Sequence, residues 1–287
     1  MSYADRLGLP DPAVIAADVE RAFAEDLGGG DATADLLPAQ ATATAVLTCR
    51  DHAVLCGSAW FNACFRRLDA DVAIAWRAAD GEAVEAGAAI CELSGRARAL
   101  VSAERSALNF LQLLSGTATV TARFVAAVGG TGTRILDTRK TIPGLRRAQK
   151  YAVRCGGGSN HRMGLYDAIL IKENHIIAAG GIEAAVRRAR QAHADLPVEI
   201  EVETLAQLAT ALEAGVDRIM LDNFTREATV AAVAHAAGRT PLEVSGNVGL
   251  DSVATLAGLG VDYISVGALT KHVHAVDLSL RLRLRLD

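Results

Sequence analysis

The sequence predicts an α/β protein, and three of its features support that prediction. Half of the 287 residues are apolar and under a quarter are charged, which is typical of a globular chain. Up to about residue 117, helical and strand patterns are mixed. From about residue 130, short β-branched runs recur and a helical pattern follows each one, which predicts parallel β-α units.

The first part of the chain supplies helices and strands in turn. Residues 12–26 have helical spacing and stop at the glycine run 28–30. Residues 42–55 are rich in strand formers, and residues 80–93 predict two short strands around a glycine turn. Residues 103–114 predict a long helix with leucines on a shared face.

The second part supplies the repeated strands, which close as a barrel or open as a doubly wound sheet. A barrel gathers the carboxyl ends of its strands around one mouth, whereas an open sheet spreads them along an edge. The leucine-arginine alternation of residues 280–286 predicts one more strand, which returns to the N-terminal sheet with its arginines solvated. The repeated strands are expected at 133–138, 168–173, 198–204, 217–223, 242–248 and 262–268.

Composition excludes several classes of function. A net charge of −4 argues against an extended basic face for nucleic acid. The first ten residues include Asp5 and Arg6, so no secretory signal is expected. The uncharged stretch 106–122 is shorter than the ~20 residues of a membrane span and is expected to be a buried helix. The five cysteines form no C-x-x-C pair, which indicates reduced thiols in the cytoplasm.

Polar residues gather at one end of the predicted strands. Each repeated strand ends on charged, hydroxyl, amide or glycine residues directly after an apolar run. Core packing gives no reason for this placement, whereas a shared site at the carboxyl ends of parallel strands does. The residues concerned are Arg139, Lys140, Lys172, Glu201, Glu203, Asp222, Asn223, Ser245, Gly246, Asn247 and Gly267.

The cationic members of this set predict an anion site. Arg139 and Lys140 precede a proline that keeps the chain out of helical geometry, so they are expected in a loop at a strand end. A three-glycine run leads to His161 and Arg162 and lets the backbone pass close to a ligand. Lys172 follows apolar residues expected to be buried, where a lysine is costly unless it meets an anion.

The acidic members predict a magnesium site. Glu199, Glu201 and Glu203 share one face of a strand, and Asp222 ends the next strand. Carboxylates at neighbouring strand ends suit Mg²⁺, although they could instead pair with the cations of the same site. Whether Glu199 and Glu203 contact the metal or only support Glu201 stays open.

Two glycine-containing turns complete the predicted site. SGNVG at 245–249 and SVGA at 265–268 end the last two repeated strands and precede helical segments, where backbone N–H groups bind phosphate well. No Ser-His-Asp set and no cysteine nucleophile is evident. The site is therefore expected to act by positioning and electrostatics.

These motifs together resemble the quinolinate phosphoribosyltransferase family. The resemblance covers almost the whole chain, from EDLGGGDATADLL at 25–37 and AERSALNFLQLLSGTAT at 103–119 to near the C-terminus. It is broken at Lys271-His272, where the family often has His-Ser. The motifs that carry it are DTRKT at 137–141, GGGSNHR at 156–162, EVET at 201–204, LDNF at 221–224 and YISVGALT at 263–270.

The resemblance implies a fold and a reaction. The fold is an N-terminal α/β sandwich domain of residues 1–117, joined by the strand 275–287, followed by an irregular six-stranded α/β barrel of residues 118–274. The reaction joins quinolinate to phosphoribosyl pyrophosphate and gives nicotinate mononucleotide, pyrophosphate and CO₂, in NAD biosynthesis. It implies Mg²⁺ as the cofactor and no organic cofactor.

The resemblance also implies roles for individual residues. Lys140, Lys172, Glu201 and Asp222 would be catalytic, and Glu201 and Asp222 would hold Mg²⁺. The chain would form a homodimer in which Arg105 reaches the partner's site. The implied substrate-binding residues are Arg105, Thr138, Arg139, Lys140, His161, Arg162, Lys172, Glu201, Asp222, Ser245, Gly246, Asn247, Val266, Gly267 and Ala268.

Three alternative functions stay open at this point. One is a relative within the family, associated with molybdenum transport or using nicotinate without decarboxylation. A second is an aldolase-like barrel in which Lys172 forms a Schiff base. A third is a phosphate-binding or scaffolding protein without catalytic activity.

Overall fold

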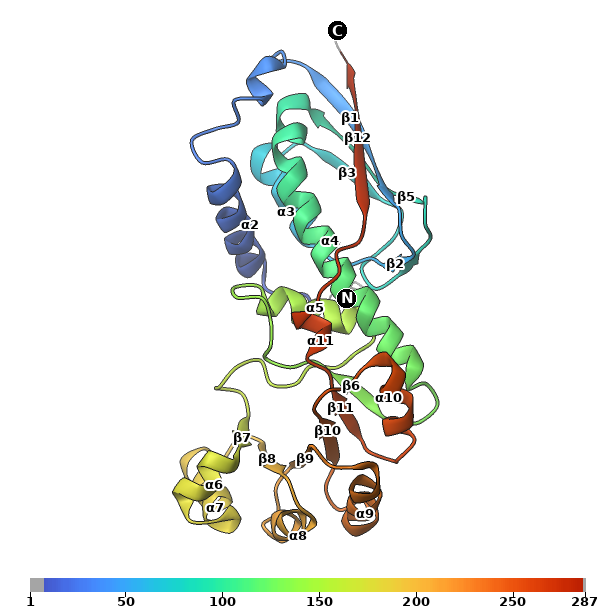
Figure 1. The fold of residues 1–287 in the computed structure, drawn as a ribbon. Coiled ribbons are helices and arrows are strands. Elements are labelled where there is room, and N and C mark those ends of the chain that lie inside the picture. Colours follow the sequence, from blue (N-terminus) through green and yellow to red (C-terminus); the bar gives the residue numbers. More distant parts are fainter. Residues whose placement is uncertain (1–7, 286–287) are drawn as a thin grey trace. The chain divides into compact units, whose positions relative to one another are not determined.

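The computed structural model describes residues 8–285, which form two compact units (Figure 1). Within the described range, the first unit comprises residues 8–122, 141–157 and 272–285, and the second comprises 123–140 and 158–271. The segment 141–157, which the sequence-based division included in the barrel, clusters with the first unit. Asp5, Arg6 and the predicted strand residue Leu286 lie outside the described residues.

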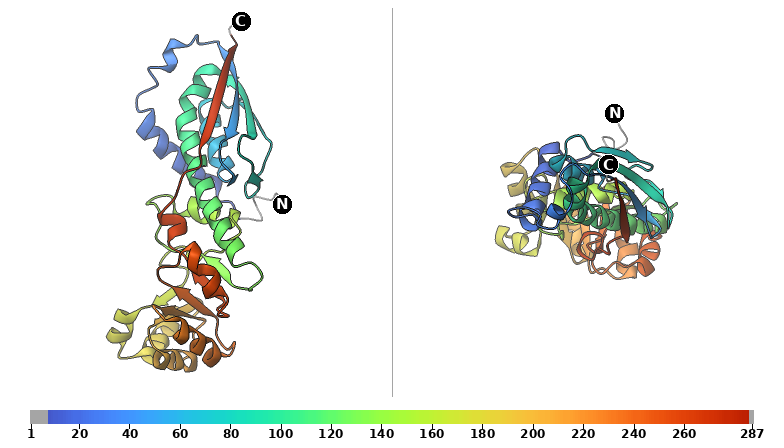
Figure 2. Two further views of the ribbon diagram at one scale, coloured as in Figure 1. Left: turned by 45° about the vertical axis from the view of Figure 1, so that its right-hand side comes forward. Right: turned by 90° about the horizontal axis from the view of Figure 1, so that it is seen from above.

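An antiparallel sheet in the order β12-β1-β5-β3 forms one layer of the first unit. As predicted, the strand near the C-terminus returns to it, because β12 pairs with β1 from Thr42–Arg285 to Cys49–Leu278 (Figure 2). Leu280 is buried and the three arginines of β12 are exposed. The strands of this unit are β1 (Thr42–Cys49), β3 (Ala73–Trp76), β5 (Ala89–Arg96) and β12 (Leu278–Arg285), with a second small sheet of β2 (Ala53–Val54) and β4 (Ala83–Val84).

Helices and aromatic side chains make up the rest of the first unit. Trp60, Phe61 and Phe65 are fully buried with Tyr151, and the rings of Trp60 and Tyr151 lie 5.9 Å apart. The indole N–H of Trp60 donates to Asp18 at 2.9 Å. The helices are α2 (Pro12–Asp26), the short 3₁₀ helix η1 (Ala34–Leu36), α3 (Ser58–Leu68), α4 (Ala97–Ala127) and α5 (Arg146–Cys155).

Helix α4 contains both predicted helical segments, 103–114 and 106–122, and extends beyond them at each end. It continues through a stretch of serine, threonine and glycine that has weak helical propensity. The hydroxyls of Thr117, Thr119 and Thr121 each donate to the carbonyl four residues earlier, so these groups are satisfied without breaking the helix. Among the described residues, no helix combines the length and apolar character needed to cross a membrane.

The second unit is a parallel sheet in the order β6-β11-β10-β9-β8-β7, as the β-α rhythm predicts. Helices α7, α8 and α9 follow one another along one side of it (Figure 1). The strands are β6 (Arg134–Leu136), β7 (Ile169–Ile171), β8 (Val198–Val202), β9 (Arg218–Asp222), β10 (Leu242–Ser245) and β11 (Tyr263–Ser265). The helices are α6 (Glu173–Ala179), α7 (Ile182–Ala192), α8 (Leu205–Glu213), α9 (Arg226–Ala236), α10 (Leu250–Ala257) and α11 (Ala268–Lys271).

The two edge strands of this sheet explain why the six-stranded barrel is irregular. β6 and β7 are its two outer strands, and in the ladders of the described residues they do not pair with each other. Ser159 instead extends the ladder at β6, because its N–H donates to Ile135 at 2.8 Å and its carbonyl accepts from Asp137 at 3.2 Å. The chain that follows α5 is thereby brought alongside the carboxyl end of β6.

The two faces of the parallel sheet differ in polarity. Ile200 and Val202 of β8 are fully buried on one face, whereas Glu199 and Glu201 alternate with them and point to the other. Because apolar side chains pack under helices, the acids are directed to the inner face of the sheet, as the strand pattern predicts.

Candidate active site

A cavity of about 320 Å³ lies at the carboxyl ends of the parallel strands, where the sequence predicts a site. Segments from 138 to 265 contribute to it, so the polar strand ends do gather at one place. Its lining consists of Thr138, Arg139, Lys140, His161, Arg162, Leu170, Lys172, Glu201, Met220, Asp222, Ser245, Gly246 and Ser265.

The loop after β6 is held by a buried aspartate. Asp137 is fully buried and accepts hydrogen bonds from the backbone N–H of His161 at 2.9 Å and from Asn160 at 2.6 Å. On the other side, Thr138 accepts from the N–H of Lys140 at 3.1 Å, and Thr270 donates to the Lys140 carbonyl at 2.8 Å. These bonds present Arg139 and Lys140 at a strand end.

Two arginines form a cationic wall of the cavity. The Nε of Arg139 is buried without a hydrogen-bond partner among the described residues. Burial lowers the pKa of Arg162, and the nearby charge of Arg139 lowers it further, which indicates two guanidinium groups close enough to repel each other. One Nη of Arg162 donates to the Ala168 carbonyl at 3.1 Å. An anion between the two arginines would relieve the repulsion and satisfy the unpaired donor.

Lys172 lines the cavity, where it pairs with a carboxylate of the site, and it is not buried. Its Nζ lies 2.5 Å from Glu201, and half of its side chain is exposed. The expectation of burial was wrong because β7 is an edge strand, in which Ile169 and Leu170 are only partly covered. The sequence left open whether the acids pair with cations of the same site, and Glu201 does pair with Lys172.

Glu201 and Asp222 end the neighbouring strands β8 and β9. Burial raises the pKa of Asp222, and the negative charge of Glu201 raises it further, while Lys172 and Lys140 act in the opposite direction. Two carboxylates that repel each other in this way could hold a divalent cation with a preference for oxygen ligands. Glu203 is exposed and absent from the cavity lining, whereas Glu199 lies deeper on the inner face.

The turns after β10 and β11 contain residues with positive φ or with no room for a side chain. Gly246 has φ +103°, and a side chain there would approach Asn223 to 3.2 Å. A side chain at Gly267 would meet the Cδ of Lys140 at 3.1 Å, so this glycine makes room for the lysine. Asn247 is exposed with φ +44°.

Gly267 and four other predicted substrate-binding residues are absent from the lining of this cavity. Val266 is buried, and its N–H donates to Leu136 at 2.9 Å, so only its remaining backbone could meet a ligand. Ala268 begins α11, and Asn247 lies beyond Gly246 in the turn. Arg105 is exposed on α4 of the first unit.

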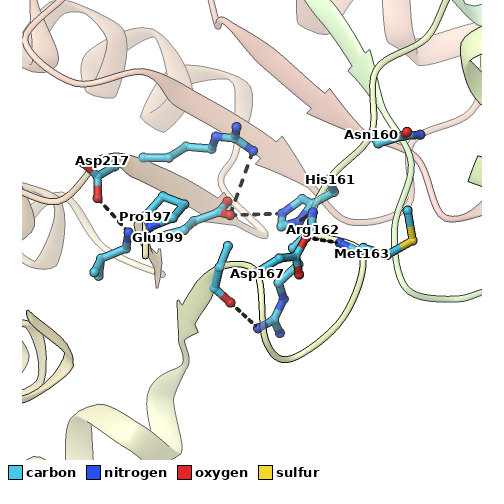
Figure 3. A pocket seen from close by; sticks show the side chains of 11 residues that line it. Asn160, His161, Arg162, Met163, Asp167, Pro197, Glu199 and Asp217 are labelled. Atoms are coloured by element: carbon cyan, nitrogen blue, oxygen red, sulfur yellow. Dashed lines mark hydrogen bonds and ion pairs between the residues drawn. The ribbon is translucent and has the colours of Figure 1, made fainter. Parts of the chain in front are cut away.

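The ring of His161 has partners on both nitrogens (Figure 3). Its Nε2 lies 3.0 Å from Glu199 and 3.7 Å from Glu243, and its Nδ1 accepts from the backbone N–H of Arg162 at 2.7 Å. The sequence-based prediction considered neither Glu243 nor Arg218, which pairs with it at 3.1 Å. The signal in the sequence is the charge of Glu243 between two apolar residues of the strand run LEV. It was missed because the prediction drew on polar residues at strand ends.

Two family models together match almost the whole chain. A family model described as the C-terminal domain of quinolinate phosphoribosyl transferase matches residues 117–281, and one described as the N-terminal domain matches residues 31–115.

Individual relatives agree with these matches. A probable nicotinate-nucleotide pyrophosphorylase [carboxylating] of Bacillus subtilis is 42% identical over 267 residues, which is 91% of each chain. The nicotinate-nucleotide pyrophosphorylase [carboxylating] of Mycobacterium leprae is 47% identical over 73% of this chain and 75% of its own. The solved nicotinate-nucleotide pyrophosphorylase of Francisella tularensis has a TM-score of 0.94 and 47% identity, covering 96% of this chain and 99% of its own.

Proposed function

The chain belongs to the quinolinate phosphoribosyltransferase family, and we propose that it transfers the phosphoribosyl group of phosphoribosyl pyrophosphate to quinolinate with loss of CO₂. The products are nicotinate mononucleotide and pyrophosphate, and the step belongs to NAD biosynthesis. The observation that carries the proposal is the cavity that Arg139, Arg162 and Lys172 line together with the carboxylates of Glu201 and Asp222. Its cations suit a dicarboxylate, and its acids suit the metal of a pyrophosphate substrate.

Quinolinate binding follows from the cationic wall. Its two carboxylates sit on adjacent ring carbons, so a compact group of cations can hold both. Arg139 and Arg162 would bind bidentately, and Lys172 would act as a point charge. For this, Lys172 must exchange Glu201 for a substrate carboxylate, which its half-exposed side chain allows.

The acids would hold the metal of the second substrate. When bound, Mg²⁺ supplies positive charge to the pyrophosphate, and Glu201 and Asp222 are the residues that would hold it. The two residues fit Mg²⁺ because both offer carboxylate oxygens and because their negative charges repel each other. Burial raises the pKa of Asp222 most, and the charge of Glu201 raises it further. The same exchange that frees Lys172 for quinolinate frees Glu201 for this role.

The remaining polar groups would orient the phosphoribosyl donor. The 5′-phosphate would take the turn of Ser245, Gly246 and Asn247, with the backbone of residues 266–268 and the hydroxyl of Thr138. Lys140, which lies beside Gly267, would reach the donor or the charge that develops as pyrophosphate leaves.

The chemistry then needs positioning more than covalent catalysis. The sugar becomes oxocarbenium-like as pyrophosphate leaves, and the ring nitrogen of quinolinate captures it. The resulting pyridinium accepts the electron pair left when the adjacent carboxylate departs as CO₂, and a proton from solvent replaces that carboxylate. No organic cofactor is required for any of these steps.

An assay of labelled CO₂ tests the proposal. Purified protein with phosphoribosyl pyrophosphate and Mg²⁺ is expected to release CO₂ from carboxyl-labelled quinolinate and to form nicotinate mononucleotide in equal amount. Turnover of nicotinate in place of quinolinate would contradict it. Borohydride trapping of a substrate on Lys172 would instead support a Schiff-base enzyme.

We further propose a cytoplasmic homodimer in which Arg105 completes the partner's site. Five buried free thiols support a reducing compartment, and the exposed position of Arg105 leaves it available to a second chain. Mixing inactive Arg105→Ala and Lys172→Ala chains should restore about a quarter of wild-type activity, since half of the dimers are mixed and each has one intact site. No restoration after subunit exchange would place Arg105 outside the site.

A further inference from the structure

Four charged side chains meet on the inner face of the parallel sheet and form what we call the inner charge cluster: His161, Glu199, Arg218 and Glu243. His161 contacts Glu199 at 3.0 Å and Glu243 at 3.7 Å. Arg218 contacts Glu243 at 3.1 Å and Glu199 at 3.9 Å. The sequence analysis named His161 and Glu199 as candidate site residues, but neither Arg218 nor Glu243.

The cluster is buried and nearly balanced in charge. The side chains of His161, Glu199 and Glu243 are 8%, 7% and 0% exposed. One proton on either His161 or Glu243 makes the sum of the four charges zero. Burial raises the pKa of Glu243, as does the charge of Glu199, whereas His161, Ser265 and Arg218 lower it. Burial lowers the pKa of His161, but the hydrogen bond and charge of Glu199, with Glu243, outweigh it and raise the pKa overall.

Stability alone does not account for these charges. A buried ion-pair network is on average no more stabilising than apolar residues of the same volume, because each charge loses its hydration. The Oε1 atom of Glu199 is buried without a hydrogen-bond partner among the described residues, which adds to the cost. A network that is costly to bury and borders a cavity is a candidate for function.

The cluster touches the substrate cavity through His161. This residue and Arg162 line that cavity and also a second one of about 360 Å³, whose lining includes Glu199 and Arg218. The two side chains therefore form the wall between the cavities. Since Nδ1 of His161 accepts from the backbone N–H of Arg162 at 2.7 Å, the position of the histidine ring also constrains the arginine.

We propose that Glu243, Arg218 and Glu199 are positioning residues for quinolinate, because they fix His161, and through it Arg162, in the wall of the substrate cavity. The inference rests on the proposed function and extends it to residues outside the cavity lining. Glu199 holds the ring directly. Glu243 makes a second contact to the ring and holds Arg218, which in turn lies over the ring of Tyr263 at 4.3 Å.

A metal at the cluster is the competing explanation. One ligand atom each from His161, Glu199 and Glu243 lies within 4.8 Å of the others. Arg218, however, already places a cation 3.1 Å from Glu243 and balances the charge that a metal would otherwise balance. This contact favours an ion-paired network.

The decisive variant is Glu243→Gln, which keeps the side-chain volume and removes the charge. We expect the KM for quinolinate to rise about tenfold, as for the loss of one charge-assisted hydrogen bond, while kcat and the KM for phosphoribosyl pyrophosphate stay within about twofold. Glu243→Asp should restore part of the affinity. The matched control Glu213→Gln changes an exposed glutamate of α8 and should leave both constants unchanged.

A double-mutant cycle tests the route through the histidine. If Glu243 acts through His161, adding Glu243→Gln to His161→Gln should raise the KM for quinolinate no further. Additive effects, or an equal rise of both KM values, would overturn the assignment. So would a tightly bound transition metal that the wild type carries and Glu243→Gln lacks.

A measurement without substrate separates this inference from the proposed function. The ring resonances of His161 in the ligand-free protein should shift in Glu243→Gln, and the midpoint of their titration should fall, because a charge that raises the pKa of His161 is gone. Unchanged resonances would overturn the inference even if quinolinate is turned over. If Glu243→Gln does not fold, Glu199→Gln provides the comparison, because it also removes a charge that raises the pKa of His161.

Discussion

The two larger sheets of this protein differ in the charge that they bury. The antiparallel sheet of the first unit belongs to a core of large apolar groups, with Trp60, Phe61 and Phe65 fully buried. The parallel sheet of the second unit buries Glu199 and Glu243 on its inner face. Apolar burial stabilises a fold, whereas buried charge does so poorly. The difference indicates that the first unit serves stability, and that the second gives up stability for a site.

Trp60→Ala should have the largest effect on folding. It removes a fully buried indole and leaves Asp18, which accepts its N–H, without that donor. We expect a loss of about 3–5 kcal/mol in the free energy of unfolding, measured by denaturant titration. A loss below about 1 kcal/mol would contradict the role of this core.

Lys172→Ala should have the opposite profile. We expect kcat/KM for quinolinate to fall about 10³-fold, because the variant loses a cation proposed to contact the substrate. The free energy of unfolding should change by less than about 0.5 kcal/mol, since the side chain is half exposed. Arg187→Ala, which removes an exposed cation of α7, is the matched control and should change neither quantity. An active Lys172→Ala would remove this lysine from the mechanism.

The inner charge cluster should make the stability of the protein depend on pH. The pKa of Glu243 is raised to about 7, mainly by burial and then by Glu199. Between its unfolded pKa and this value, the folded state binds more protons than the unfolded state, so stability falls as the pH rises. Relative to wild type, Glu243→Gln should therefore gain on the order of 3 kcal/mol between pH 5 and pH 8.

Calorimetric unfolding of both proteins across that range checks the sign. His161 acts in the same direction, because its raised pKa gives stability below neutral pH that is lost as it deprotonates. Parallel stability curves for wild type and Glu243→Gln would show that Glu243 does not titrate in this window.

Asp222→Asn should have a smaller effect, confined to metal dependence. The substitution removes one proposed carboxylate ligand but also the repulsion with Glu201. We expect the Mg²⁺ concentration for half-maximal activity to rise about tenfold, measured at saturating quinolinate. An unchanged Mg²⁺ requirement would exclude Asp222 as a ligand.

The sequence predicted the class of fold and the family correctly, and the comparisons confirm both. All six repeated strands are present, and helix α2 has the predicted bounds. These predictions succeeded because the alternation of apolar and polar residues is a local property. The two ends of α4, before residue 103 and after residue 122, were not predicted, because apolar periodicity identifies a helix better than its boundaries.

The site was predicted in part. Placing Arg139, Lys172, Glu201 and Asp222 at strand ends was sufficient to bring them to one cavity, since parallel strands share an edge. The exposure of Lys172 was not predictable, because the order of the strands decides which one lies at an edge. The roles assigned to these residues stay predictions until the variants are measured.

The sequence by itself determined which segments are strands and which residues end them, because the periodicity of a strand and the residues that follow it are written along the chain. Only the tertiary structure decided that His161 turns toward Glu199 and Glu243, that Asp137 anchors the loop at His161, and that residues 141–157 pack with the first unit. Each of these depends on contacts between segments far apart in sequence, and burial sets their energies. No pattern within a single segment encodes such contacts.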